Sequence, residues 1–228
     1  MTKAADKIIV ALDVATGKAA LDLLSELHST VGYFKVGLQL YTATGPAVIR
    51  GGAFLGKVFL DLKLFDIPNT VTNAVAAVSR LGVQMLTIHL SGGAEMIRAA
   101  TGRKGKILIL GVTVLTSANE QTLHEAGVSD TIENQVLRLA RLGIENGIDG
   151  IVASPHEIKI LRREFGDRIK IVVPGIRPTW SEPGDQKRFM TPREALEAGA
   201  DYLVIGRPIT AHPKPQEAVA KILEEIRG

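Results

Sequence analysis

The segment Phe59-Leu60-Asp61-Leu62-Lys63-Leu64 alternates its side chains in the way that a β-strand with two different faces does. The three leucines share one face, so Phe59, Asp61 and Lys63 share the other. Pro68 follows after a short turn, and proline is typical of the first turn of a helix. A strand followed at once by a helix is a βα unit, whose apolar face packs against helices. The two charges are therefore expected to point to the interior of the sheet, at the C-terminal end of this strand.

The same order of strand and helix recurs along all 228 residues. Runs rich in β-branched residues predict eight strands, at 8–14, 33–38, 58–64, 85–90, 107–115, 150–153, 169–173 and 202–205. Helical spacing of apolar residues predicts helices at 18–28, 70–81, 94–101, 131–146, 155–165 and 213–226. Such alternation is typical of parallel strands joined by right-handed crossovers. We therefore expect an α/β fold, a (β/α)8 TIM barrel, formed by residues 1–228 as a single domain.

Three junctions between a helix and the next strand repeat one local pattern. They are Leu81-Gly82-Val83-Gln84, Asn146-Gly147-Ile148-Asp149 and Ala198-Gly199-Ala200-Asp201. In each, glycine can take the left-handed conformation that ends a helix. The alternative fold is a doubly wound open sheet, but the first βα turn, Asp13-Val14-Ala15-Thr16-Gly17, lacks the G-x-G-x-x-G pattern of a dinucleotide-binding sheet. The repeated βα unit favours the barrel.

Two connecting segments, 117–130 and 176–190, are longer than connectors between strand and helix need to be. Long βα loops often bind ligands or close over them, so both are expected on the catalytic side of the barrel. Trp180 lies in the second segment, either as a packing anchor or as an incidental residue. Thr191-Pro192-Arg193-Glu194 has the pattern of a capping box and predicts the start of a helix.

The composition excludes several classes of function. Lys and Arg total 27 and Asp and Glu total 24, and the formal charge of +3 is not gathered into basic tracts, so no nucleic-acid partner is expected. An aromatic content of 4% provides no platform for stacked bases. The lack of cysteine excludes disulfides, thiolate metal sites and a cysteine nucleophile. We expect neither a leader peptide nor a membrane-spanning helix, and hence a cytoplasmic protein without a membrane partner.

Other strands also carry polar groups on the face predicted to point inward. Strand parity places Asp13, Lys35, Thr87 and His89 there. Active sites of such barrels form at the C-terminal ends of the strands, and buried charges are costly unless they are paired. A catalytic array of charges is therefore favoured over a structural ion-pair network that closes the barrel. His89 is expected to be a hydrogen-bonded core residue, and Asp66 either caps the next helix or belongs to the site.

The loops after strands seven and eight have the features of a phosphate site. Val173-Pro174-Gly175-Ile176-Arg177 and Ile205-Gly206-Arg207 lie where barrels frequently bind phosphate. Arg207 provides a planar set of donors that suits phosphate oxygens, and for this residue alone an exposed charge at the rim of the barrel is an equal alternative. Gln186 would add an amide from a loop that closes over the ligand. The five histidines show no metal-ligand spacing, so no metal site is expected.

These residues resemble those of one known family, orotidine 5′-phosphate decarboxylase. Its signature Asp-x-Lys-x-x-Asp is matched by Asp61, Lys63 and Asp66. Further matching blocks follow in order along the chain, at 8–13, 34–37, 113–117, 174–177 and 205–209. The resemblance implies loss of CO₂ from C6 of orotidine 5′-phosphate, without metal or cofactor, to give UMP in pyrimidine biosynthesis.

The resemblance also implies a role for each matching residue. Lys63 would protonate C6, Asp61 would lie beside the substrate carboxylate, and Lys35 would belong to the same catalytic array. The other implied roles are ribose binding by Asp13, pyrimidine contact by Thr116, phosphate binding by Arg177, Gln186, Gly206 and Arg207, and contributions of Asp66, Ile67 and Thr70 to the neighbouring active site of a homodimer.

Two other functions compete with this interpretation. A related metal-dependent branch, similar to 3-keto-gulonate-6-phosphate decarboxylase and hexulose-phosphate synthase, shares the signature but has Glu at the position of Lys35 and needs Mg²⁺. A lysine at this position would repel the cation, which favours the metal-free reaction. A barrel that binds a phosphosugar without chemistry is the other alternative, and the presence of both Asp61 and Lys63 disfavours it.

Overall fold

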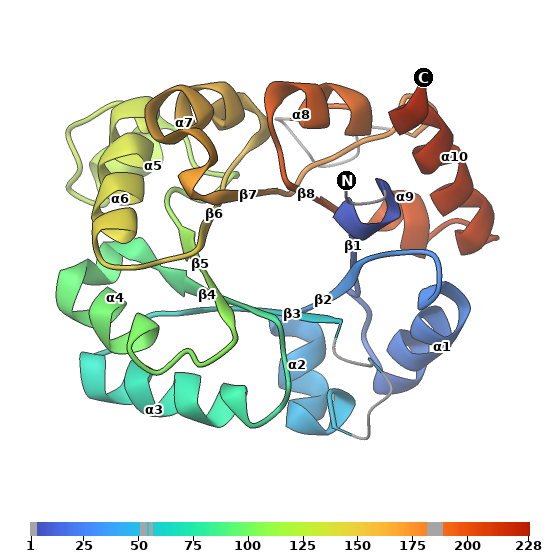
Figure 1. Ribbon diagram of the computed structural model, residues 1–228, viewed down its shortest axis with the longest axis horizontal. Coiled ribbons are helices and arrows are strands. Elements are labelled where there is room, and N and C mark those ends of the chain that lie inside the picture. Colours follow the sequence, from blue (N-terminus) through green and yellow to red (C-terminus); the bar gives the residue numbers. More distant parts are fainter. Residues whose placement is uncertain (1–3, 51–53, 55–56, 182–188) are drawn as a thin grey trace.

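The chain forms a closed barrel of eight strands in sequential order, each pairing in parallel with its neighbours. The structure is a computed structural model that describes residues 4–50, 54, 57–181 and 189–228. Figure 1 shows the strands as a ring with the helices packed around its outside. The pairing of β1 with β8 closes the ring, so the expected (β/α)8 TIM barrel is confirmed.

Each strand is short and lies close to its predicted position, and β8 matches it. The strands are β1 (Ile8–Ala11), β2 (Tyr33–Gly37), β3 (Val58–Leu64), β4 (Met85–His89), β5 (Leu108–Val112), β6 (Gly150–Val152), β7 (Lys170–Val173) and β8 (Tyr202–Ile205). The α-helices are α1 (Gly17–Leu27), α2 (Leu38–Thr44), α3 (Pro68–Ser79), α4 (Gly93–Thr101), α5 (Glu120–Glu125), α6 (Ile132–Glu145), α7 (Ile158–Phe165), α8 (Pro192–Ala198), α9 (Arg207–Thr210) and α10 (Pro215–Arg227). Within the described ranges, none of these helices has the length and apolar character needed to cross a membrane.

The boundary of β8 needs no correction, because it matches the predicted range of 202–205. Three of the helices were not predicted from the sequence. Residues 38–44 form α2, whose start at Gly37 has no side-chain cap to announce it. Residues 120–125 form α5 inside a segment that was expected to be a loop, because Asn119 and Thr122 make a capping box. The short helix α9 directly follows β8. The capping box at Thr191 is confirmed as the start of α8.

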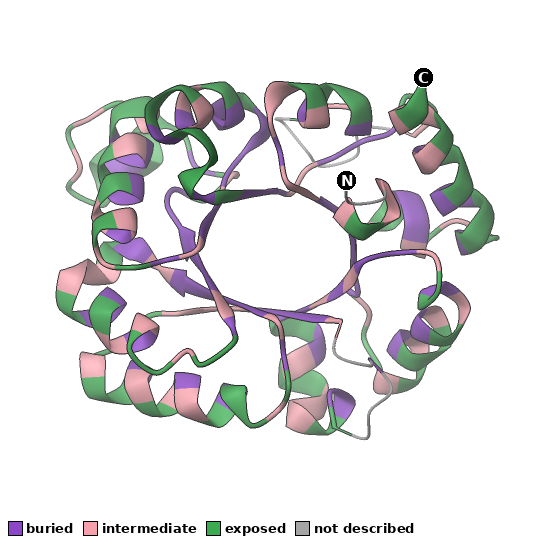
Figure 2. Ribbon diagram, viewed as in Figure 1, coloured by how far each residue is buried: buried purple, intermediate pink, exposed green. Residues whose placement is uncertain are grey.

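Two separate apolar layers pack on the two faces of the sheet. Ile9, Ala11, Phe59 and Met85 belong to a small cluster inside the barrel. Their chain neighbours, such as Leu60, belong to the large cluster between strands and helices. The alternation predicted from the sequence is therefore confirmed, and Figure 2 shows the buried strands against the exposed outer faces of the helices. Interior positions beyond the inner cluster are thus available to polar groups at the C-terminal ends of the strands.

The three repeated junctions lie at the N-terminal ends of the strands, opposite the end that carries the polar groups, and stabilise this N-terminal end of the barrel. Gly82, Gly147 and Gly199 have φ values of 74°, 87° and 114°, which confirms the predicted left-handed helix ends. The residue two positions after each glycine makes two hydrogen bonds with one residue of the strand that precedes it in the chain. Its N–H donates to the carbonyl of that strand residue, and its side chain accepts from the N–H of the same strand residue. The reciprocal pairs are Gln84 with Val58, Asp149 with Ile109 and Asp201 with Ile171, at 2.8–3.0 Å.

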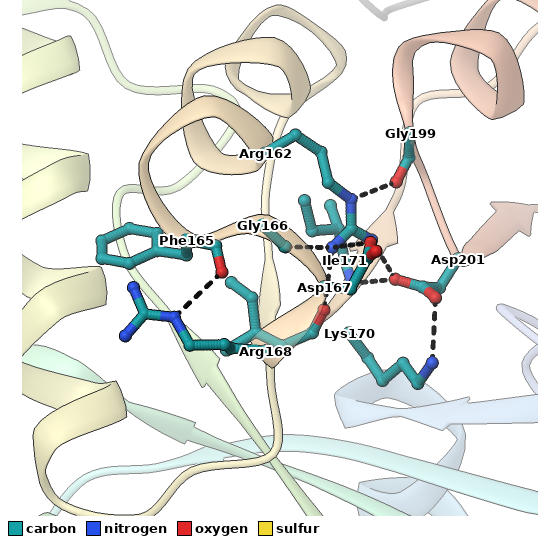
Figure 3. A network of polar contacts seen from close by, with 10 residues as sticks. Arg162, Phe165, Gly166, Asp167, Arg168, Lys170, Ile171, Gly199 and Asp201 are labelled. Atoms are coloured by element: carbon teal, nitrogen blue, oxygen red, sulfur yellow. Dashed lines mark hydrogen bonds and ion pairs between the residues drawn. The ribbon is translucent and has the colours of Figure 1, made fainter.

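Asp201 makes further polar contacts beyond its reciprocal pair with Ile171. Its carboxylate also accepts from Lys170 at 3.1 Å and from the guanidinium of Arg162. Arg162 in turn donates to the carbonyls of Gly199, Gly166 and Ile169, so one side chain of α7 contacts both the segment before β7 and the turn before β8 (Figure 3). Backbone N–H and carbonyl groups are paired here with partly buried side chains, which holds the N-terminal end of the barrel together.

Candidate active site

A cavity of about 430 Å³ opens at the C-terminal ends of the strands, within the size range of small-molecule sites. Its lining includes charged side chains from the first three strands and the turn after β1: Asp13, Lys35, Asp61 and Lys63. It also includes residues that follow β5, β7 and β8: Thr116, Gly175, Arg177, Gly206 and Arg207. Apolar side chains, among them Val112, Val152 and Val204, line it as well. The topology thus brings together residues that are almost 200 positions apart, as the order of strands in a barrel requires.

The four charged residues of the first strands form a chain of alternating sign. Lys35 Nζ lies 2.9 Å from Asp13 Oδ1 and 3.8 Å from Asp61 Oδ2. Lys63 Nζ lies 2.9 Å from each carboxylate oxygen of Asp61. The side chains of Lys35 and Asp61 are 12% and 13% exposed, against 30% for Lys63 and 55% for Asp13. The charges of Lys35 and Asp61 are therefore largely removed from water. Ionic interactions are much stronger in such an environment than at the surface.

The backbone of Lys63 is unusual. Its φ of 50° makes it the sole non-glycine residue with positive φ in the described part of the chain. The pairing between β3 and β4 shifts its register between Leu60 and Leu64, as a β-bulge does. The N–H of Lys63 donates to the hydroxyl of Thr87 at 2.8 Å, and that hydroxyl donates to Asp61 Oδ1 at 2.9 Å. The bulge is thus the local feature that aims the ammonium of Lys63 into the cavity mouth.

Two guanidinium groups are placed on the part of the cavity formed after β7 and β8. Arg177 is 7% exposed, and it donates from Nη1 to the carbonyl of Ile176. Burial, and secondly the nearby charge of Arg207, lower the pKa of Arg177 from its ordinary value. Two cations that face one region attract an anion, and Gly175, with φ of 79°, brings the backbone close to the same place. Gln186, also predicted for this site, lies outside the described residues.

Three of the predicted site residues do not line the cavity. Asp66, Ile67 and Thr70 follow β3 and are all exposed. Asp66 Oδ1 accepts from the N–H of Ile67 at 2.7 Å, and Ile67, the residue before α3 (Pro68–Ser79), makes no side-chain capping bond. The alternative that Asp66 caps this helix is therefore wrong. The chain itself does not bring these three residues into the site.

Two residues whose roles the sequence left open have clear surroundings. Trp180 packs edge-on against His212, with centroids 5.9 Å apart, and the ammonium of Lys221 lies 5.6 Å from its ring centroid. It is therefore a packing anchor against α10 and the turn before it. His89 shares a hydrogen bond of 2.8 Å with Ser91 and packs edge-on against Phe65. Burial, and secondly the charge of Lys63, lower the pKa of His89.

The residue that sequence reasoning undervalued is Thr87. Parity placed it inward, but threonine in a strand is common, and its contact with Lys63 depends on a bulge in the neighbouring strand. No local pattern in the sequence announces that bulge, so the signal was the inward polar position alone.

Comparison with known proteins identifies similar sequences and structures over nearly the whole length of this chain. Residues 6–222 match the family described as "Orotidine 5′-phosphate decarboxylase / HUMPS family". The chain is 47% identical over 235 residues to the orotidine 5′-phosphate decarboxylase of Heliobacterium modesticaldum, which covers 98% of this chain and 97% of that protein. It is 49% identical over 234 residues to the one from Moorella thermoacetica, covering 98% and 93%. A crystal structure of orotidine 5′-phosphate decarboxylase from Lactobacillus acidophilus aligns with a TM-score of 0.84 and 34% identity, over 97% of this chain and 99% of that one.

Proposed function

The chain belongs to the orotidine 5′-phosphate decarboxylase / HUMPS family, and on this premise we propose that it is a carboxy-lyase that converts orotidine 5′-phosphate to UMP and CO₂ in pyrimidine biosynthesis. The observation that carries the proposal is the alternating chain Asp13, Lys35, Asp61 and Lys63 in a cavity that also presents two guanidinium groups. Such a cavity suits a substrate with a phosphate at one end and a reacting carboxylate at the other.

The chemistry starts at the bond between C6 and the carboxylate carbon. This bond breaks, CO₂ leaves, and the electron pair stays on C6 as a developing carbanion. The ammonium of Lys63 stabilises this charge in a site with little water, and then transfers a proton from Nζ to C6. Lys63 is left neutral and regains a proton from solvent after UMP departs. No cofactor is needed, because the side chain supplies both the charge and the proton.

The other residues of the array bind and orient. Asp61 lies beside the leaving carboxylate, where it holds Lys63 through two contacts of 2.9 Å and destabilises the bound carboxylate by like charge. Lys35 holds Asp61 and Asp13. In the proposed reaction, Asp13 accepts from ribose hydroxyls. Thr116 contacts the pyrimidine. The phosphate is bound by Arg177, Gly206 and Arg207, with Gln186 as a further donor, and its binding energy organises the reacting end.

Metal-free chemistry is supported by what the carboxylates already bind. Asp61 contacts two ammonium groups and Asp13 contacts one, so a divalent cation would have to displace Lys35 and Lys63. Lys35 also stands where the metal-dependent branch of the family carries Glu. An ammonium at that position opposes binding of a cation by charge repulsion.

An absorbance assay with orotidine 5′-phosphate tests the proposal. Turnover to UMP that is equal in EDTA and in Mg²⁺ is expected. Turnover that vanishes in EDTA would instead indicate the metal-dependent branch. Absence of turnover in both, together with binding of UMP, would indicate a phosphate-binding barrel without chemistry.

We also propose a homodimer in which each chain completes its partner's site. Four large apolar side chains are exposed after the C-terminal ends of β2, β3 and β5, on the face of the barrel that carries the cavity. They are Leu38 (57% exposed), Phe65 (63%), Ile67 (66%) and Leu115 (46%). Apolar side chains gathered on one face favour association. The exposure of Asp66, Ile67 and Thr70 outside their own cavity supports a role across this interface. Sedimentation equilibrium is expected to give twice the chain mass.

Two further expectations from the sequence stay predictions. They are the cytoplasmic location and the organisation of residues 1–228 as a single domain.

A further inference from the structure

Thr87 is placed where one hydroxyl serves two residues of the proposed charge array. It lies in the middle of β4, it is fully buried, and it does not line the cavity. Its oxygen accepts from the backbone N–H of Lys63 at 2.8 Å, and its proton is directed to Asp61 Oδ1 at 2.9 Å. A hydroxyl has one donor and two acceptor sites, so both of these bonds are within its capacity.

These contacts close a ring of interactions around the Asp61–Lys63 ion pair. Lys63 is joined to Asp61 through its ammonium at one end and through its backbone N–H and Thr87 at the other. The left-handed backbone of Lys63 is unfavourable for a residue with a Cβ, and such a conformation persists only where surrounding contacts determine it. Within the described ranges, the Thr87 hydroxyl is the partner of that strained N–H.

We propose that Thr87 is a positioning residue, whose hydroxyl fixes both the backbone of Lys63 and the carboxylate of Asp61 and so aims the ammonium at the reacting carbon. This inference rests on the proposed decarboxylation. Thr87 touches no substrate, and its effect reaches the chemistry through Lys63. Small displacements of a reacting group lower the rate of the chemical step more than they change binding of distant parts of the ligand.

Thr87→Val removes the hydroxyl and keeps the shape. We expect kcat for orotidine 5′-phosphate to fall about 10- to 100-fold, while KM and the Kd of UMP change less than about threefold, because the phosphate end is untouched. Thr87→Ser restores the hydroxyl and is expected to recover most of the rate. Should Thr87→Val not give folded protein by circular dichroism, Thr87→Cys takes its place, since a thiol is a weak hydrogen-bond partner of similar size.

Thr113→Val is the matched control. Thr113 follows β5, is 2% exposed, and its hydroxyl has no hydrogen-bond partner among the residues described. The same chemical change at this equally buried site is expected to leave kcat unchanged. Equal loss of kcat in Thr87→Val and Thr113→Val, a wild-type kcat in Thr87→Val, or a Thr87→Ser enzyme as slow as Thr87→Val would each overturn the proposal. An inactive wild-type chain would instead overturn the proposed function itself, so the two failures are distinguishable.

Discussion

Lys63 combines a strained backbone with a proposed catalytic role. A left-handed backbone costs a residue with a Cβ roughly 1–2 kcal/mol, and at Lys63 this cost is accepted at the point where a strand ends in a bulge. The same bulge turns the ammonium toward Asp61 rather than along the strand. Strain located at such a position is typical of functional sites, because the rest of the barrel is stable enough to hold it.

His89 has consequences for pH dependence at this scale. Its pKa is lowered below the ordinary 6.5 by burial and by Lys63, so the folded chain binds this proton less readily than the unfolded chain. The unfolded state therefore gains protons first as pH falls, and the free energy of unfolding decreases as pH drops below about 6.5 toward the lowered value.

His89→Asn should remove this part of the acid sensitivity. We expect urea unfolding between pH 7 and 5 to show a smaller loss of stability in the variant than in the wild type, with the two slopes differing by at most about 1.4 kcal/mol per pH unit. Parallel pH profiles for the two proteins would contradict this account of His89.

At the scale of elements, the connection from β3 to α3 carries Phe65, Asp66 and Ile67 away from their own cavity. If two chains share their sites, a chain that lacks Lys63 and a chain that lacks Asp66 have complementary defects. In a hybrid dimer, one site carries both defects and the other carries neither.

When Lys63→Ala and Asp66→Ala are refolded together in equal amounts, half of the dimers are expected to be hybrids, and one of the two sites of each hybrid is intact. The mixture should therefore show about a quarter of the wild-type rate. Each variant refolded alone serves as the control. A mixture no more active than its components would show that Asp66 acts in its own chain or not at all.

The elements that the sequence predicted are those with a strong local pattern. The alternation around Asp61 and Lys63 survives in the structure because burial of the leucine face leaves only one register for the strand. The helix α2 was not predicted, because Gly37, the residue before it, has no side chain that could cap it, and the first residues of the helix resemble a continued strand. The bulge at Lys63 was not predicted, because the hydroxyl that pairs with its backbone N–H belongs to Thr87, 24 residues away on another strand.

The candidate site was predictable to a similar degree. Residues that parity turns inward, such as Lys35 and Asp61, line the cavity as expected. The places of Asp66, Ile67 and Thr70 could not follow from local pattern or from a single chain, because these residues do not line the cavity that Lys35 and Asp61 line. Their roles depend on a second chain and stay predictions.

At the scale of the whole molecule, the two ends of the barrel have different tasks. The C-terminal end carries strained and charged groups around a cavity, whereas the N-terminal end carries the reciprocal pairs made by Gln84, Asp149 and Asp201. Gly32 stands at the corresponding fourth junction, where its N–H donates to Ile8 and the backbone of Asp6 occupies the place of a side chain. The stabilising side-chain contacts thus lie at the end of the barrel opposite the cavity, as is usual in this fold.

Asp201→Ala tests this division. It leaves the N–H of Ile171 and the guanidinium of Arg162 without their carboxylate, and we expect the free energy of unfolding to fall by about 1–3 kcal/mol while kcat stays at the wild-type value. Asp167→Ala is the control: its side chain is fully exposed, it lies 3.7 Å from Arg162, and its loss should not change the urea midpoint measurably. A slower enzyme that is as stable as the wild type would contradict the separation of the two ends.

The central claim is that the ammonium of Lys63, held by Asp61 at the mouth of the barrel, delivers the proton to C6. The most direct measurement compares kcat of Lys63→Ala with its affinity for UMP, by single-turnover absorbance and by calorimetry. The account predicts that turnover falls by about 10⁴-fold or more, while UMP, which binds through its phosphate and ribose, is still bound by the variant. Turnover close to the wild-type rate in Lys63→Ala would contradict it.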